Sequence, residues 1–136
     1  MSFAVDTSVI IASTIAEHEY HAPARRAMTR ATHLPAACLA ESWSVLTRAF
    51  GLDPVTVGQV ITALVKSGRD LLVATREDYA EVFRHGAAIG LRGDIHDALI
   101  WQACQRSDVE LVTLDRRWVQ RAGQPDRCRY LLDERA

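Results

Sequence analysis

The sequence predicts an α/β protein with a mostly parallel sheet flanked by helices. Short apolar runs alternate along the chain with longer amphipathic segments, and several of these runs end on an acidic residue just before a helix begins. Strands that alternate with helices form parallel sheets whose faces those helices cover. No internal repeat, linker or low-complexity segment interrupts the 136 residues, so we expect one domain over residues 1–136.

The spacing of the apolar residues sets the expected elements. The expected strands comprise residues 2–5, 32–35, 71–73, 111–114 and 129–132. The expected helices comprise residues 7–12, 19–31, 36–50, 55–66, 76–89, 95–104 and 116–121. Helix 36–50 has the clearest pattern, because Leu39, Trp43, Leu46 and Phe50 recur as one apolar stripe. Helix 55–66 is apolar on one side, which suits a subunit interface.

Composition indicates an ordinary globular protein, with 49% hydrophobic and 24% charged residues. The formal net charge is −1, so no overall basicity points to a nucleic-acid partner, although a local basic rim is allowed. No apolar run is long enough to span a membrane, and Asp6 falls where a signal peptide needs apolar residues. We therefore expect a cytoplasmic protein with no membrane partner.

Residues that often bind metals or act as nucleophiles are scattered. Cys38, Cys104 and Cys128 lack the close pairing of a zinc or redox motif, which favours a structural, buried role for each. His18 and His21 are close enough to suggest a metal site, but the polar connection around them favours a solvated surface. Neither a cysteine nucleophile nor a Ser-His-Asp set is indicated by spacing.

Acidic residues converge on one edge of the predicted sheet. Asp6 follows the first strand, Asp97 opens helix 95–104, and Asp115 follows the fourth strand. Carboxyl ends of strands and amino ends of helices share the rim of an open α/β sheet where ligands bind. Glu41, early in helix 36–50, can join them.

Each acid also has a local explanation. Asp6 can cap the first helix in place of Thr7 or Ser8, Glu41 can complement a helix start, and Asp94 with Asp97 resembles a capping box. A common site is favoured because one simple topology brings all of the acids to the same rim.

Four clustered carboxylates need a positive partner. At a separation of about 4 Å and an effective dielectric near 20, each pair repels by about 4 kcal/mol. Mg²⁺ or Mn²⁺ prefers oxygen ligands, keeps waters for substrate phosphates and lowers the pKa of a bound water. His96 points about 100° around the helix from Asp97, so we expect it to be structural or to support a ligand.

Four parts of the chain carry a family resemblance. They are Val5–Ile10 (VDTSVI), Glu41, Gly93–Ala98 (GDIHDA) and Leu111–Arg116 (LVTLDR). In this order and spacing they resemble the PIN-domain ribonucleases, and among them the VapC-type toxins of bacterial toxin–antitoxin pairs. The resemblance covers nearly the whole chain, and the order and spacing carry it rather than any single motif.

The resemblance implies four acidic residues that hold Mg²⁺ or Mn²⁺ and carry catalysis: Asp6, Glu41, Asp97 and Asp115. It places hydroxyl groups near the metal at Thr7, Ser8 and Thr113, and gives Asp94 a variable role. It also implies a single PIN-like domain with about five parallel strands.

The same resemblance implies an activity and its partners. The protein is expected to be a toxin that hydrolyses RNA as an endoribonuclease through metal-activated water. Its partners would be the RNA substrate, a small cognate antitoxin that covers the active-site groove, and a second copy in a homodimer. Arg92, Arg116 and Arg117 are placed to contact RNA phosphates, or to pair with the acids beside them.

Two other classes of function fit the sequence less well. A catalytically silent PIN-like module that binds RNA or a protein is disfavoured because all four acids are present. A haloacid-dehalogenase-like phosphatase needs an acid two residues after Asp6, where this chain has Ser8. A receiver-like domain needs a lysine at the end of a late strand, and the only lysine, Lys66, lies in a predicted helix.

Overall fold

The computed structural model describes residues 2–124 and 126–133, which form one five-stranded parallel sheet and seven helices. The strands are β1 (Phe3–Val5), β2 (His33–Pro35), β3 (Asp70–Leu72), β4 (Glu110–Thr113) and β5 (Cys128–Tyr130). The helices are α1 (Thr7–Thr14), α2 (His21–Arg30), α3 (Ala36–Arg48), α4 (Pro54–Val65), α5 (Arg76–Ile89), α6 (Ile95–Arg106) and α7 (Arg116–Ala122). The predicted α/β class with a parallel sheet is confirmed.

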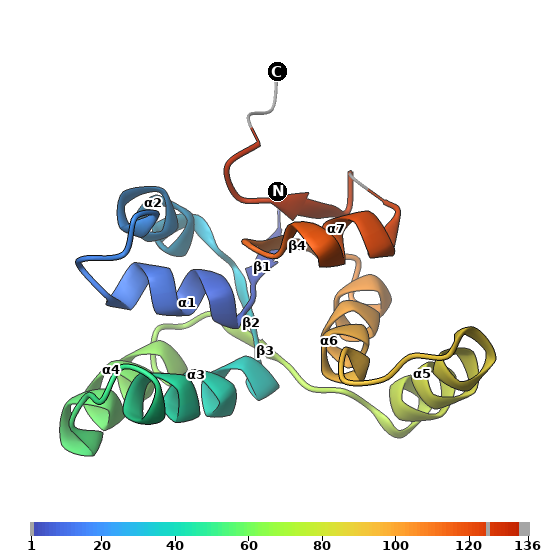
Figure 1. The fold of residues 1–136 in the computed structure, drawn as a ribbon, viewed down its shortest axis with the longest axis horizontal. Coiled ribbons are helices and arrows are strands. Elements are labelled where there is room, and N and C mark those ends of the chain that lie inside the picture. Colours follow the sequence, from blue (N-terminus) through green and yellow to red (C-terminus); the bar gives the residue numbers. More distant parts are fainter. Residues whose placement is uncertain (1, 125, 134–136) are drawn as a thin grey trace.

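The order of the strands determines where a ligand can bind. Neighbouring strands follow the order β3-β2-β1-β4-β5, and every pair is parallel. The chain moves outward from β1 through β2 to β3, then returns to the other side of β1 for β4 and β5. Helices α1–α4 therefore lie on one side of the sheet and α5–α7 on the other (Figure 1). The direction reverses between β1 and β4, which is where open α/β sheets bind their ligands.

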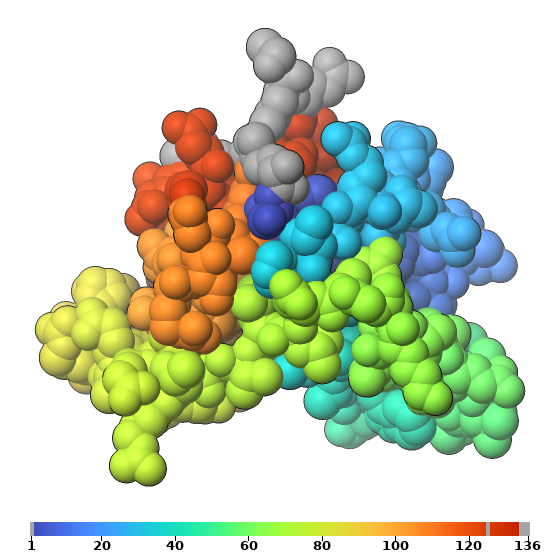
Figure 2. All heavy atoms as spheres, turned by 180° about the vertical axis from the view of Figure 1, so that it is seen from behind, coloured from blue at the N-terminus to red at the C-terminus, as the bar shows by residue number. Residues whose placement is uncertain are grey.

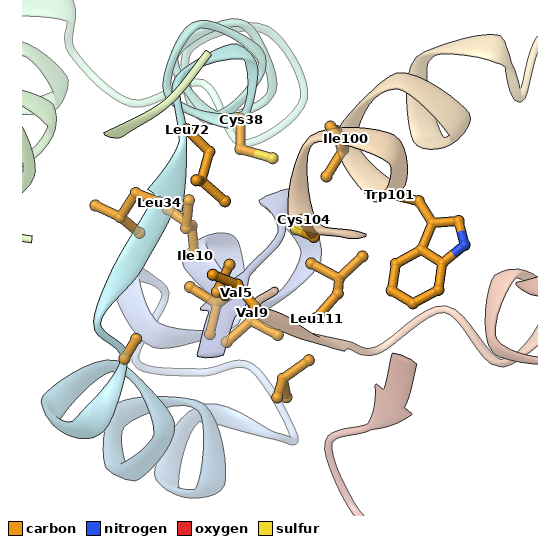
Figure 3. Packing of buried hydrophobic residues seen from close by; sticks show 14 of the residues in the cluster. Val5, Val9, Ile10, Leu34, Cys38, Leu72, Ile100, Trp101, Cys104 and Leu111 are labelled. Carbon is orange, nitrogen blue, oxygen red and sulfur yellow. The ribbon is translucent and has the colours of Figure 1, made fainter. Parts of the chain in front are cut away.

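The main core surrounds the two central strands. Val5 of β1 and Leu111 of β4 are buried, and residues of α1, α3 and α6 pack around them (Figure 3). A smaller cluster of Ile11, Leu46 and Val57 joins α1, α3 and α4. Burial of β1 and β4 on both faces matches their short, continuous apolar sequences.

Half of the stripe predicted on helix 36–50 is wrong. Leu39 and Leu46 are buried, but Trp43 is 41% exposed and Phe50 is 43% exposed. Helix α3 ends at Arg48, so Phe50 no longer follows the helical period. Trp43 instead lies at the edge of α4, against Gly58.

Capping side chains set the helix ends. The Asp6 carboxylate accepts the Val9 N–H at the start of α1, so Asp6 is the cap and neither Thr7 nor Ser8 is. Thr75 caps α5 in a capping box with Asp78. None of the helices in the described ranges is long and apolar enough to cross a membrane.

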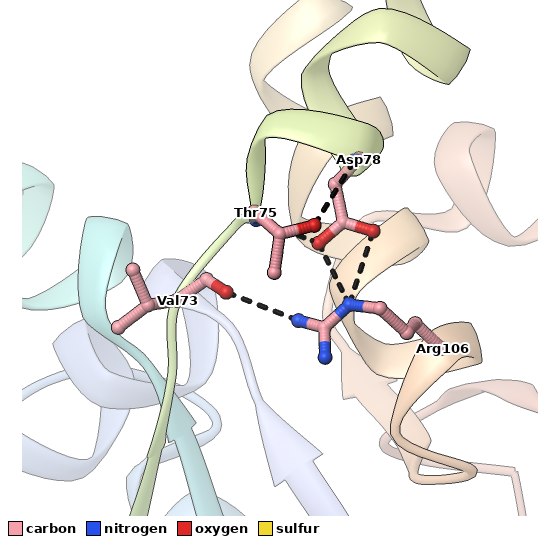
Figure 4. Close-up of polar contacts among 4 residues, drawn as sticks. All are labelled: Val73, Thr75, Asp78 and Arg106. Atoms are coloured by element: carbon pink, nitrogen blue, oxygen red, sulfur yellow. Dashed lines mark hydrogen bonds and ion pairs between the residues drawn. The ribbon is translucent and has the colours of Figure 1, made fainter.

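Helices α4 and α5 project at opposite sides of the molecule, as Figures 1 and 2 both show. Helix α5 is attached at its amino end by an ion pair between the buried Asp78 and the partly exposed Arg106 (Figure 4). The Asp78 carboxylate is 1% exposed, and both of its oxygens accept the Arg106 Nε–H, at 3.1 and 2.9 Å. Arg106 Nη2 also donates to the Val73 carbonyl at 3.0 Å, so the end of α6 holds the segment between β3 and α5.

The Asp78–Arg106 pair stabilises the fold. Burial raises the pKa of Asp78, but hydrogen bonds from Thr75 and from Arg106 outweigh this effect and hold the pKa below its ordinary value. Removal of the guanidinium would leave a buried carboxylate with only its capping bonds.

We therefore expect Arg106→Gln to lower the free energy of unfolding by about 2 kcal/mol, measured by urea denaturation near neutral pH. Arg84→Gln is the matched control, because Arg84 pairs with Glu81 on the exposed surface of α5. That control should cause no measurable loss. Equal losses in the two variants would contradict a structural role for the Asp78–Arg106 pair.

Candidate functional site

The four predicted acids line one cleft at the rim between β1 and β4. Asp6 follows β1 directly and caps α1, while Asp115 follows β4 and caps α7 through the Trp118 N–H at 3.1 Å. Asp97 lies in the first turn of α6, and Glu41 lies in α3. The cleft has a volume of about 560 Å³, and its lining includes all four carboxylates.

Two hydroxyl groups hold the Asp6 carboxylate in place. Ser8 Oγ donates to Asp6 Oδ1 at 2.5 Å, and the Thr113 hydroxyl donates to Asp6 Oδ2. Each hydroxyl also accepts a backbone N–H from the turn after β4: Leu114 N–H to Ser8 Oγ at 2.9 Å, and Asp115 N–H to Thr113 Oγ1 at 3.0 Å. Because an ionised carboxylate can only accept hydrogen bonds, both hydroxyls donate their protons to Asp6 while they accept the backbone N–H groups.

Of the three hydroxyls expected near the metal, Ser8 and Thr113 contact the Asp6 carboxylate. The Thr7 hydroxyl is buried beside the thiol of Cys38 instead. Sequence reasoning located these hydroxyls but not their direction, because the direction depends on the turn that follows β4.

The acids affect one another electrostatically. Burial raises the pKa of Asp6, against the opposing hydrogen bonds from Ser8 and Thr113, and the charge of Asp115 raises it further. Burial also raises the pKa of Asp97 from 3.8 to about 6, and the charges of Asp6, Asp115 and Glu41 add to that rise. The cleft therefore concentrates negative charge that the protein alone does not neutralise.

Asp94 does not form the predicted capping box. It occupies the position before α6, but its side chain makes no capping hydrogen bond to that helix. Asp94 Oδ1 instead accepts the Arg92 backbone N–H at 3.1 Å, and Oδ2 pairs with Arg121 of α7. The local explanation of Asp97 as the partner of a cap is therefore wrong.

Among the described residues, two histidines lie by the acid cluster: His18 lines its cleft, and the exposed His96 of α6 is near enough to lower the pKa of Asp97 against the opposing effects. The His21 Nδ1 bonds with the Ala12 carbonyl at 2.8 Å and joins α2 to α1, so the expected solvated surface is wrong for His21. His18 and Tyr20, from the segment between α1 and α2, form a further wall of the cleft. That wall was missed because the polar segment before α2 has no periodic pattern.

The three cysteines are buried, as predicted. Burial raises the pKa of each thiol to about 12, which keeps them protonated and unreactive.

The donor set fits a hard divalent cation. Four carboxylates offer only oxygen ligands, and the mutual effect on the pKa of Asp97 shows that their charges reach one another. Their arrangement is open, however: among residues 2–124 and 126–133, no group of three His, Cys, Asp or Glu side chains is gathered closely enough to hold a metal ion. Repulsion between uncompensated carboxylates favours such an open arrangement.

The raised pKa of Asp97 predicts a pH-dependent stability in EDTA. The folded protein holds this proton with a pKa of about 6 against 3.8 ordinarily, so ionisation costs stability as the pH rises through that range. Asp97→Asn cannot ionise, and we expect it to raise the free energy of unfolding at about pH 8 by about 1–2 kcal/mol after solvent screening.

At about pH 4 the same variant should differ little from the wild type. Urea denaturation at the two pH values measures the difference. Asp53→Asn, at the exposed cap of α4, is the control and should keep the wild-type pH dependence, since asparagine caps equally well. A loss of stability in Asp97→Asn at about pH 8 would contradict the electrostatic account.

Comparison with known proteins identifies the family. The PIN domain profile matches residues 3–124. The chain is 33% identical over 121 residues to Ribonuclease VapC40 of Mycobacterium tuberculosis, in strains CDC 1551 / Oshkosh and ATCC 25618 / H37Rv, covering 86% of this chain and 89% of the relative. The crystal structure of M. tuberculosis VapC20, described as a Sarcin-Ricin loop cleaving toxin, has a similar fold with a TM-score of 0.72 at 18% identity. That match covers 90% of this chain and 95% of VapC20. The chain therefore belongs to the PIN domain family and is a VapC-type PIN ribonuclease.

Proposed function

We propose that this ribonuclease is the toxin of a toxin–antitoxin pair and that it hydrolyses internal phosphodiester bonds of RNA with Mg²⁺ or Mn²⁺. The observation that carries the proposal is the cleft at the β1–β4 reversal, which all four carboxylates line. A bound ion would supply an activated water and neutralise charge on the phosphate. Asp6, Glu41, Asp97 and Asp115 are the residues that would hold it.

Hydrogen bonds within the protein orient two of these carboxylates before any ion binds. Ser8 and Thr113 fix both oxygens of Asp6, so one proposed ligand is oriented in advance. Asp115 is similarly restrained by the Trp118 N–H, through one oxygen only. Glu41 is exposed on α3, so it has the freedom to adjust its position. Asp6 and Asp115 are therefore held in place, whereas Glu41 can move toward a bound ion.

Partners follow from the family and from the surface. We propose that a small antitoxin covers the acid cleft and that the protein forms a homodimer. Exposed apolar side chains on α4 and α5, among them Val55, Tyr79 and Phe83, offer surfaces for these contacts. Three buried free thiols suit a reducing compartment, and we place the protein in the cytoplasm.

Purified protein should cleave RNA in Mg²⁺ or Mn²⁺, and EDTA should stop cleavage. Asp6→Asn and Asp97→Asn should each lower the cleavage rate by at least about a hundredfold while circular dichroism shows an intact fold. The matched control is Asp108→Asn, which removes an exposed carboxylate paired with Arg127 and should keep full activity. Cleavage that persists in EDTA or in Asp97→Asn would contradict the proposed metal site, whereas a wild-type protein that binds RNA without cleaving it would favour a silent binding module.

A further inference from the structure

A second cleft, of about 580 Å³, adjoins the acid cleft and brings arginines beside the acids. The two clefts share Asp97 and Asp115, so they form one continuous surface. The second cleft is lined by Arg92 before α6 and by Arg117 and Arg121 of α7. By contrast, no arginine or lysine is among the described residues that line the acid cleft.

Most arginines near the site already have a partner. The Arg116 guanidinium stacks on the ring of Tyr130, 3.9 Å from its centre, and Arg121 pairs with Asp94. Arg92 and Arg117 are exposed, and within the described part of the chain neither forms an ion pair with a carboxylate. Arg116 also lines neither cleft, whereas Arg92 and Arg117 line the second cleft and have no carboxylate partner in the described part of the chain.

A polyanion that approaches four carboxylates is repelled unless cations lie along its path. One divalent ion offsets only part of the negative charge of four carboxylates. The arginines that line the two clefts are all in the second cleft, on the α6–α7 side. Guanidinium groups bind phosphate through two parallel hydrogen bonds, which suits a phosphodiester backbone.

We propose that Arg92 and Arg117 bind the RNA phosphates that flank the bond to be cut, and that these phosphates lie on the α6–α7 side of the carboxylates. The proposal rests on the proposed ribonuclease function for the identity of the polyanion. Asp94 holds Arg121 against the loop that carries Arg92, so the Asp94–Arg121 pair supports the shape of this subsite.

The test compares R92Q, R117Q and the double variant with R116Q as the matched control. R116Q removes the same charge from the same turn of α7. The guanidinium that it removes stacks on the ring of Tyr130. The probe is a fluorescein-labelled single-stranded RNA of mixed sequence, about 20 nucleotides long, whose binding is followed by anisotropy in Ca²⁺ buffer at several salt concentrations. A gel checks that the RNA stays intact, and circular dichroism checks each fold.

Each single variant should weaken RNA binding about tenfold and the double variant about a hundredfold, while R116Q stays within about twofold of the wild type. The slope of log affinity against log salt should fall by about 0.7 for each arginine removed. Mn²⁺ affinity, measured by calorimetry without RNA, should stay within about twofold in all variants, because no arginine is a ligand.

Unchanged RNA affinity and salt slope in R92Q/R117Q would overturn the subsite, as would an equal loss in R116Q. If R92Q/R117Q instead weakened only the binding of an acidic antitoxin, the cleft would belong to that protein and the RNA subsite would be wrong. A wild-type protein that binds RNA through these arginines but does not cleave it would leave the subsite standing and refute the proposed function.

Discussion

One carboxylate, Asp6, joins the ends of the neighbouring strands β1 and β4 through hydrogen bonds. Its two oxygens accept the hydroxyls of Ser8 and Thr113, and both hydroxyls accept backbone N–H groups from the turn after β4. The end of β1, the start of α1 and the turn into α7 are therefore held in one arrangement. That arrangement also places Asp115 beside Asp6, because the Asp115 N–H is itself one of the donors.

The electrostatics of the site follow from this arrangement. Asp6 and Asp97 are each partly buried among acidic neighbours, so burial and the neighbouring charges raise both pKa values. A protein can hold such a cluster only at a cost in stability, which a bound cation would remove. In the cleft beside the acids, the arginines without a carboxylate partner among the described residues are Arg92 and Arg117. The carboxylates of the acid cleft suit a metal site, and the arginines of the adjoining cleft suit a phosphate-binding surface.

Much of this could be predicted from the sequence because it depends on short-range rules. Apolar runs and caps predicted the alternating elements, and the strand-end positions of Asp6 and Asp115 predicted a shared rim. Contacts between distant segments could not be predicted. Asp94 had the spacing of a capping box, yet Arg121, which lies 27 positions later in the sequence, draws its carboxylate away from the helix.

Adjacent residues can also differ in ways that the sequence does not show. Arg116 and Arg117 look equivalent, but only the first meets the ring of Tyr130 from β5. Trp43 has the right period for the core, yet it lies at an edge because α4 covers only part of α3. In each case the contacting residue is distant in the sequence, so the local pattern of residues could not predict the contact.

The most direct measurement is a calorimetric titration with Mn²⁺ of the wild type, Thr113→Val, Thr113→Ser and Asp6→Asn. If Thr113 orients Asp6 as a metal ligand, Thr113→Val should weaken Mn²⁺ binding by about ten- to a hundredfold, whereas Thr113→Ser keeps the hydroxyl and most of the affinity. Asp6→Asn should abolish binding at the same site. Mn²⁺ affinity that is unchanged in Thr113→Val and in Asp6→Asn would contradict the account, because the ion would then bind away from this carboxylate.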